Sequence, residues 1–380
     1  MSAHICPVVK LGEPIAIPGA DKIEVFNVEG SGPVVQAKGQ FKAGDLACFI
    51  PPETMVDSSL AAFDFLKKSS RKSDGWAKVK PIRLRGQLSV GILVSSMGNP
   101  EGANLAKEYN VKKIEDLDVK LEPMSKPKGL WQRVKAWWRK KNDPEVKAIW
   151  PGIPVYDINQ LYKLRPGTFN DSELMVVTEK LHGTNARYVI GKDGKLWCGS
   201  RTMWRLHDGK NVYSRAAVES GIEAKLKRLA EPLVLWGEII GPSIQKGFHY
   251  GLKDSEIKFY AFDIYNAAER RFLDPRETEV ICHWLHIDRV PAVAYYSWRM
   301  LTELKKDGSG LNALMEMSMK ESDISNKLNH PMEGVVVRPF DGVKETHALD
   351  GSRCLVAGKV INPAYLEFRE KPGMDEQIML

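Results

Sequence analysis

Short apolar runs, each broken by glycine or proline, fill the first 120 residues of the chain. Examples lie at 22–29 and 46–50, and the stretch PIRLRGQLSVGILV at 81–94 continues the pattern. Short strands separated by such turns are typical of a small barrel or sandwich. We therefore expect the first block of the chain to be an all-β domain.

Basic side chains alternate along one of these predicted strands, at Lys78, Lys80, Arg83 and Arg85. They form either an ordinary solvated strand face or a row of contacts to a phosphate backbone. An OB-like barrel is the favoured form of the domain, because the curved face of that fold suits nucleic acid.

The pattern changes in the second half of the chain, where apolar runs of strand length alternate with longer amphipathic stretches. The strand-like runs lie at 174–178, 187–190, 233–236, 257–265 and 334–338, and the helical stretches at 214–229, 276–286 and 298–321. This alternation predicts an α+β domain of about 220 residues that contains substantial sheet.

A basic, tryptophan-rich insert at 123–155 separates the two predicted domains, 1–122 and 156–380. The insert holds 8 basic and 2 acidic residues, and so carries most of the net charge of +7. Apolar residues recur at helical spacing between Leu130 and Trp138, with prolines on both sides. Such a helix bridges to a neighbouring domain, binds a nucleic-acid backbone or lies on a membrane surface.

The composition excludes several classes of protein. The 380 residues are 43% hydrophobic and 27% charged, as in ordinary globular proteins. No apolar run approaches the roughly 18 residues of a membrane span, and the N-terminus lacks the layout of a signal peptide. The five cysteines are far apart and form no CxxC pair, which argues against a disulfide scaffold or a cysteine-held zinc site. We expect a protein of the reducing cytoplasm.

The most informative stretch, TEKLHGTNARYVI at 178–190, places a lysine at the end of an apolar strand. Lys180 precedes His182, Gly183 and Asn185, and the glycine permits a tight turn close to a ligand. A free lysine has a pKa of about 10.4, so a nucleophilic lysine needs burial or nearby cations to lower that pKa. Lys180 is either such a nucleophile or the partner of Glu179 on a strand edge.

Five later segments supply further candidate chemistry in a fixed order. These candidates are Arg201 in CGSRTMW, Glu238 before a glycine-rich loop, Phe262 beside Asp263 on a strand, Glu333 before a β-branched strand, and Lys359 in LVAGKVINPAYL.

In this order, the segments resemble the signature of the covalent nucleotidyltransferases, the superfamily of polynucleotide ligases and mRNA capping enzymes. Lys180-Leu181-His182-Gly183 fills motif I, and the histidine followed by Thr184-Asn185 resembles the nick-sealing RNA ligases. The later matches are Arg201 to the motif after the nucleophile, Glu238 to motif III, Phe262 to the aromatic motif, Glu333 to motif IV and Lys359 to motif V. The resemblance covers residues 170–367 almost continuously.

The order of the domains favours one branch of this superfamily. The stretches GDLACFIP and RLRGQLSVGIL look like the N-terminal OB domain of one group of RNA ligases, whereas DNA ligases and capping enzymes carry an OB domain after motif V. One departure concerns motif V, which in several relatives reads KxK. Here Ile361 takes the second place, so either Lys359 acts alone or a basic residue from elsewhere fills the gap.

The resemblance implies an ATP-dependent RNA ligase that joins 3′-hydroxyl and 5′-phosphate ends in three nucleotidyl transfers. Lys180 would attack the α-phosphate of ATP to form lysyl-AMP, AMP would pass to the 5′-phosphate, and the 3′-hydroxyl would displace it. The implied supporting roles are metal binding (Mg²⁺ or Mn²⁺) by Glu333, phosphate neutralisation by Lys359, ribose binding by Arg201 and Glu238, stacking on adenine by Phe262, and recognition of the adenine amino group by Glu179. Asn185 would orient the phosphate or the incoming strand, and His182 is counted among the residues that bind the nucleotide.

The expected partner is RNA or an RNA/DNA hybrid with a nick, with no membrane and a monomeric enzyme. Two alternatives stay open. One is a DNA ligase or a GTP-dependent capping-type enzyme, and the other is an inactive nucleic-acid-binding relative.

Overall fold

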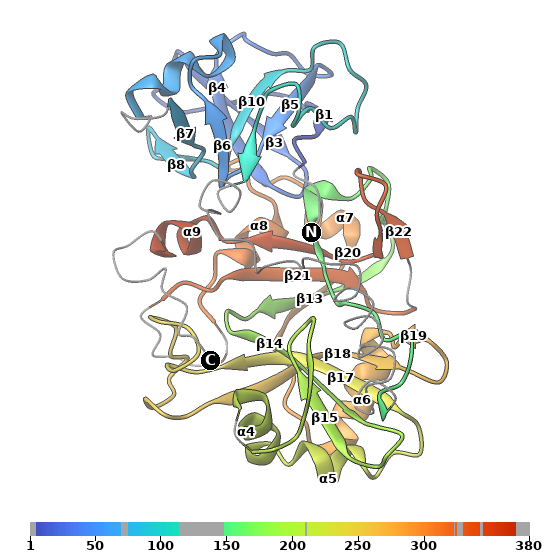
Figure 1. The fold of residues 1–380 in the computed structure, drawn as a ribbon. Helices are drawn as coiled ribbons and strands as arrows, with labels where there is room; N and C mark the ends of the chain where they lie inside the picture. The colour runs from blue at the N-terminus through green and yellow to red at the C-terminus, as the bar shows by residue number, and fades with distance from the viewer. Residues whose placement is uncertain are drawn as a thin grey trace, which may run out of the picture.

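The computed structural model describes residues 5–69, 75–113, 148–209, 211–322, 324, 330–342 and 345–369. The predicted helix between Leu130 and Trp138 lies outside these residues. No helix within the described ranges is long and apolar enough to cross a membrane. Figure 1 shows the N-terminal domain, coloured blue to cyan, on top of the larger C-terminal domain.

The N-terminal domain consists of short strands, as the sequence predicts. They are β1 (Val8–Lys10), β2 (Ile15–Ala16), β3 (Ile23–Val28), β4 (Gly32–Ala37), β5 (Leu46–Ile50), β6 (Thr54–Asp57), β7 (Trp76–Lys78), β8 (Ile82–Leu84), β9 (Gln87–Ser89), β10 (Ile92–Ser95) and β11 (Lys112–Lys113), with a 3₁₀ helix, η1 (Ala61–Ser69). The strands pair antiparallel in four small sheets, and two apolar clusters built around Phe49 and Phe63 fill the interior.

The predicted single strand carrying four alternating basic residues is wrong. Strand β7 ends at Lys78, which pairs with Glu53 at 3.2 Å, and β8 begins only at Ile82. Pro81, which lies between the two strands, has no N–H to donate to a ladder. Arg85 lies in the β8–β9 turn with a positive φ of 53°.

The C-terminal domain contains two main sheets. Their strands are β12 (Asn159–Gln160), β13 (Leu174–Lys180), β14 (Thr184–Ile190), β15 (Leu196–Gly199), β16 (Trp204–Leu206), β17 (Leu233–Ile240), β18 (Lys258–Asn266), β19 (Arg271–Phe272), β20 (Ala292–Ser297), β21 (Gly334–Pro339) and β24 (Gly358–Ile361), and β22 (Glu345–His347) pairs with β23 (Arg353–Leu355) separately. The first sheet has the order β12-β24-β21-β13-β20 and the second β16-β15-β14-β17-β18-β19. All these pairs are antiparallel except β12 with β24.

Short helices cover the outer faces of both sheets. They are η2 (Leu161–Lys163), α4 (Val212–Glu219), α5 (Ile222–Leu226), α6 (Pro275–Leu285), α7 (Trp298–Thr302), α8 (Ala313–Ser318) and α9 (Pro363–Arg369). Helices α4, α5 and α6 pack their apolar side chains on the six-stranded sheet, while α7 and α8 pack on the five-stranded sheet. The predicted α+β class is therefore confirmed.

Two predicted helices are interrupted by glycine. The stretch at 214–229 divides into α4 and α5 at Gly221, whose φ of 62° a helix interior does not tolerate. The stretch at 298–321 divides into α7 and α8, because Gly308 and Gly310 adopt φ values of 76° and 68° between them.

The turn that divides α7 from α8 holds the N-terminal domain. Asn27 Nδ2 donates to the Gly310 carbonyl at 2.6 Å, and Gln87 Nε2 donates to the Ser309 carbonyl at 2.8 Å. Gly310 has no room for a side chain, because a Cβ there would lie 2.9 Å from Val25 Cγ1. The break in the predicted helix thus forms part of the interface between the domains.

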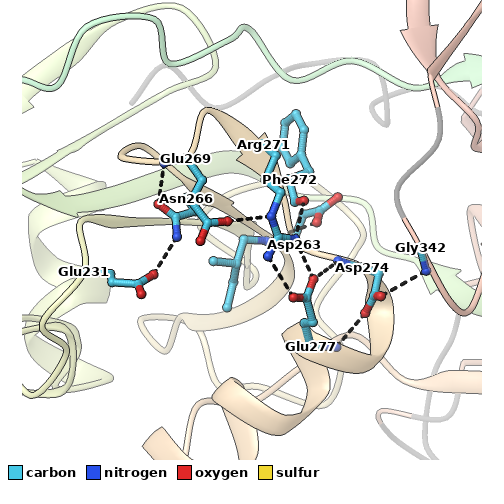
Figure 2. Close-up of polar contacts among 10 residues, drawn as sticks. Glu231, Asp263, Asn266, Glu269, Arg271, Phe272, Asp274, Glu277 and Gly342 are labelled. Carbon is cyan, nitrogen blue, oxygen red and sulfur yellow. Dashed lines mark hydrogen bonds and ion pairs between the residues drawn. The ribbon is translucent and has the colours of Figure 1, made fainter.

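A polar cluster fixes the hairpin of β18 and β19 to the start of α6 (Figure 2). The Arg271 guanidinium donates to both oxygens of Glu277, at 2.8 and 2.9 Å. Asp274 caps α6 by accepting from the Glu277 N–H, and its second oxygen accepts from the Gly342 N–H at 2.9 Å. The cluster ties α6 to the segment that follows β21.

Candidate active site

Lys180 lies where the two sheets of the C-terminal domain meet. It is the last residue of β13, the strand between β20 and β21, and the chain then crosses to β14 in the other sheet. The crossing is possible only with glycine, since a Cβ on Gly183 would lie 2.1 Å from the Ile239 carbonyl oxygen. The predicted strand-ending lysine and tight turn are both present.

The Lys180 ammonium forms an ion pair with Glu333. Its Nζ lies 2.5 Å from Glu333 Oε1, because Lys180 pairs with Gly334 at the start of β21. Burial would raise the pKa of Glu333, but the positive charge and hydrogen bond of Lys180, with the neighbouring His182, outweigh burial and lower that pKa to about 2. Glu333 is therefore a carboxylate throughout the physiological range.

Glu333 also has the features expected of a metal ligand. Its Oε2 is buried and has no hydrogen-bond partner among the described residues, and His182 Nδ1 lies 3.7 Å away from it. The described residues contain no group of three or more histidine, cysteine or acidic side chains that could hold a metal. A single carboxylate such as Glu333 suits Mg²⁺ or Mn²⁺, because these ions bind one or two carboxylates and complete their coordination with water and substrate oxygens.

Seven of the nine predicted site residues line one cavity of about 270 Å³ between the sheets. They are Glu179, Lys180, Asn185, Arg201, Glu238, Phe262 and Lys359. Asn185 and Glu238 face each other across the β14–β17 ladder. We call this space the inter-sheet cavity.

A second cavity, of about 230 Å³, lies on the other side of Lys180, between the two domains. Lys180, Glu333 and Lys359 line it from the C-terminal domain, and Glu53 and Pro81 line it from the N-terminal domain. We call this space the interdomain cavity. Lys180 and Lys359 are accessible from both spaces.

His182 lines neither cavity, and its contacts hold it beside Glu333. Its backbone N–H donates to the Tyr250 hydroxyl at 2.7 Å, and its Nδ1 lies 3.1 Å from the Tyr365 hydroxyl. Its ring packs edge-on against Phe248. These contacts place the imidazole beside Glu333.

A β-bulge directs Phe262 into the inter-sheet cavity. In the β17–β18 ladder Trp236 pairs with Asp263 and Gly237 with Ala261, so Phe262 is the extra residue. Arg338 donates to the Phe262 carbonyl at 2.7 Å and to the buried Asp263 carboxylate at 2.5 Å. The bulge and the ion pair thus fix the aromatic residue between the two sheets.

Two further residues line the inter-sheet cavity without being predicted from the sequence, Tyr156 and Asp157. Tyr156 packs on Phe262 with ring centroids 4.8 Å apart, and Asp157 lies 3.5 Å from the Arg201 guanidinium. Both residues line the cavity, as does Arg338. No motif marks Tyr156 or Asp157, although the aromatic-rich stretch around Trp150 was a signal that this segment packs on the domain.

Comparisons with known proteins match both domains. Residues 173–354 match the family model described as RNA ligase, and residues 5–96 match an OB-fold domain model. A search among curated proteins found no match to the chain. The predicted RNA ligase domain with an N-terminal OB domain is confirmed.

Solved structures of an RNA ligase from Naegleria gruberi share the fold over nearly the whole chain. The structure with PPi is 23% identical, has a TM-score of 0.66, and the match covers 97% of this chain and 99% of that one. A mutant with ATP and Mn is 23% identical, with a TM-score of 0.65 and coverages of 96% and 99%. An apo mutant is 24% identical, with a TM-score of 0.66 and coverages of 97% and 99%. The two-domain arrangement is thus common to both proteins.

Proposed function

We propose that this RNA ligase uses ATP to join 3′-hydroxyl and 5′-phosphate ends through an AMP adduct on Lys180. The observation that carries the proposal is the position of Lys180 between two cavities. A nucleoside in one cavity brings its α-phosphate to the amine, while the pyrophosphate leaving group lies in the other. The Naegleria gruberi structures with ATP, Mn and PPi support the same nucleotide and metal for this chain.

The first step exchanges one bond for another at the α-phosphorus. The unprotonated Lys180 amine forms the N–P bond, and the bond from the α-phosphorus to the bridging oxygen breaks to release pyrophosphate. Glu333 holds the lysine in place and would bind the metal, which supplies charge neutralisation to the phosphates when present. Lys359 faces the same phosphates from β24.

The two later steps transfer the adduct to the nucleic acid. The 5′-phosphate oxygen attacks the AMP phosphorus and releases the Lys180 amine, and the 3′-hydroxyl then attacks the 5′-phosphorus and releases AMP. We propose a nick in duplex RNA or in an RNA/DNA hybrid as the substrate, because His182 and Asn185 match motif I of the nick-sealing branch. We also propose a reducing cytoplasmic location, since all five cysteines are free. The monomeric state and the boundaries at 122 and 155 stay predictions.

The proposal is tested by incubating the protein with ATP, Mg²⁺ or Mn²⁺ and four nicked duplexes that differ in whether each strand flanking the nick is RNA or DNA. We expect sealing when the 3′-hydroxyl end is RNA. Equal sealing of an all-DNA nick would instead favour a DNA ligase. Use of GTP in place of ATP would favour a capping-type enzyme.

Glu238 is expected to act in its protonated form. Burial, with a smaller contribution from the Glu333 carboxylate, raises the pKa of Glu238 to about 8, so the acid is mostly neutral at pH 7. Glu238→Gln should therefore keep the KM for ATP within about threefold of wild type, whereas Glu238→Ala should raise it by about 10- to 100-fold through lost hydrogen bonds. The rate of adduct formation at pH 7, measured over a range of ATP concentrations, tests both variants. Equal losses in the two variants would show that the carboxylate form is needed.

Deprotonation of Lys359 should lower kcat/KM for ATP at high pH. Burial and the neighbouring Lys180 ammonium lower the pKa of Lys359 to about 8, so its positive charge is present below pH 8 and lost as the pH rises. Because kcat/KM reports on the free enzyme, kcat/KM for ATP should fall about tenfold per pH unit above 8 relative to a variant that keeps its positive charge at this position. Lys359→Arg stays charged and should shift this decline upward. An identical decline in the variant would assign it to another group.

A further inference from the structure

The stretch from Gly75 to Pro100 is basic and contains no acidic residue. Its four basic residues are Lys78, Lys80, Arg83 and Arg85. Lys78 pairs with Glu53, whereas neither arginine has an acidic partner among the described residues. The β8–β9 hairpin therefore presents positive charge that no acidic side chain of the described residues neutralises.

Strand β8, the outer strand of this hairpin, is not buried in the core of either domain. All residues from Ile82 to Gly86 are exposed, including Ile82 at 47% and Leu84 at 37%, so β8 is open to solvent on both faces. Strand β8 pairs only with β9, and its other edge is unpaired in the described structure. An exposed strand in which apolar and basic side chains alternate from Ile82 to Arg85 presents a mixed surface of the kind that binds nucleic acid.

The base of the hairpin is fixed to both domains. Leu88 and Val90 are buried with Met315 in the core of the C-terminal domain, and Ser89 Oγ accepts from the Val35 N–H at 2.9 Å. Gln87 also donates to the Ser309 carbonyl. The exposed turn is thus held in a defined position by a buried base.

That position is at the edge of the interdomain cavity. Pro81 and Val90, which flank the hairpin on its two sides, both line the cavity, opposite Lys180 and Lys359. At about 3.3 Å per strand residue, Arg85 lies at most about 13 Å along the chain from Pro81. In this view, β8 is on the edge of the N-terminal domain nearest α9, whose residues line the same cavity (Figure 1).

We propose that the β8–β9 hairpin binds the phosphate backbone of the nucleic-acid strand whose end lies in the interdomain cavity. Arg83 and Arg85 contact phosphates a few nucleotides from the reacting end, and Ile82 and Leu84 contact the sugars and bases between them. The contacts are independent of sequence, because they are made to the backbone. This inference rests on the proposed function, since it names the surface that holds the RNA substrate of the same site.

The test compares two double variants that remove the same charge. Arg83→Gln/Arg85→Gln alters the hairpin, and Lys38→Gln/Lys42→Gln alters the same domain beyond the end of β4. Strand β4 begins beside Met315 at Gly32 and ends at Ala37, so the control residues lie away from the interface. All four side chains are exposed, and both variants should melt like wild type.

Binding to a nicked RNA duplex is measured as a function of salt, together with lysine adenylylation and sealing. The hairpin variant should bind on the order of tenfold more weakly, with a log–log salt slope reduced by about 1.5 to 2, while adenylylation stays at the wild-type rate. The control variant should keep the wild-type slope. An unchanged slope in the hairpin variant, or an equal change in both variants, would overturn the proposal.

Failure of the proposed function gives a different result. If the wild type forms no AMP adduct and seals no nick, the ligase assignment fails, whatever the salt slopes. If wild type and hairpin variant form the adduct equally and bind RNA equally, only the hairpin assignment fails.

Discussion

Lys180→Ala is expected to abolish the AMP adduct and the sealing of nicks with 5′-phosphate ends. Lys180 supplies the atom that forms the covalent bond, and removing a catalytic nucleophile typically costs about 10⁶-fold in rate. The alanine variant also leaves the buried Glu333 carboxylate without its ion-pair partner, which lies 2.5 Å away in the wild type. A loss of folding stability is therefore expected alongside the loss of chemistry.

Lys180→Arg separates these two effects. Arginine keeps a positive charge beside Glu333 but stays protonated, so it cannot act as the nucleophile. We expect it to melt near the wild-type temperature and to form no adduct. A nick whose 5′-phosphate already carries AMP should still be sealed by this variant, because that step needs no lysine nucleophile. An adduct in Lys180→Arg would show that another residue is the nucleophile.

Glu333→Gln is expected to lower the rate of adenylylation by about 10²- to 10³-fold, as loss of one electrostatic contact to a transition state typically does. The substitution keeps the shape of the side chain but removes the charge that holds Lys180 Nζ and the buried Oε2 that suits a metal. The rate should be measured over a range of Mn²⁺ and Mg²⁺ concentrations. We expect half-maximal activity to need more metal in the variant.

The pH dependence of stability gives an independent check on Glu333. Its pKa is lowered to about 2 in the folded protein from 4.5, so the ion pair stabilises the fold above about pH 4.5 and is lost as the pH falls toward 2. The wild type should therefore lose stability over this acid range more steeply than Glu333→Gln. Matching curves, or wild-type adenylylation in the variant, would contradict the assigned role.

Apolar runs of strand length, together with the order of the motifs, were enough to predict the two domains and most of the residues that line the site. Lys180, Glu238 and Lys359 each follow or lie within an apolar strand, and such strands place their side chains predictably. The two divided helices show the limit of this approach. Periodicity continues through Gly221 and Gly310, and only the tertiary contacts show that each glycine takes a left-handed turn.

Other parts of the site depend on long-range contacts that no local pattern encodes. The bulge that directs Phe262 inward arises from the register of β17 and β18, and the carbonyl of Phe262 accepts from Arg338, 76 residues later. Tyr156 reaches the cavity from a segment with no motif of its own. Such residues become visible only once the two sheets are placed together.

The most direct test of the account is to incubate the wild-type protein with α-labelled ATP or GTP and Mg²⁺ or Mn²⁺, denature it, and map any retained label to a peptide. The account predicts label from ATP alone, on Lys180, released by pyrophosphate. Label from GTP, label on another residue, or no label in folded protein that does not already carry AMP would contradict it.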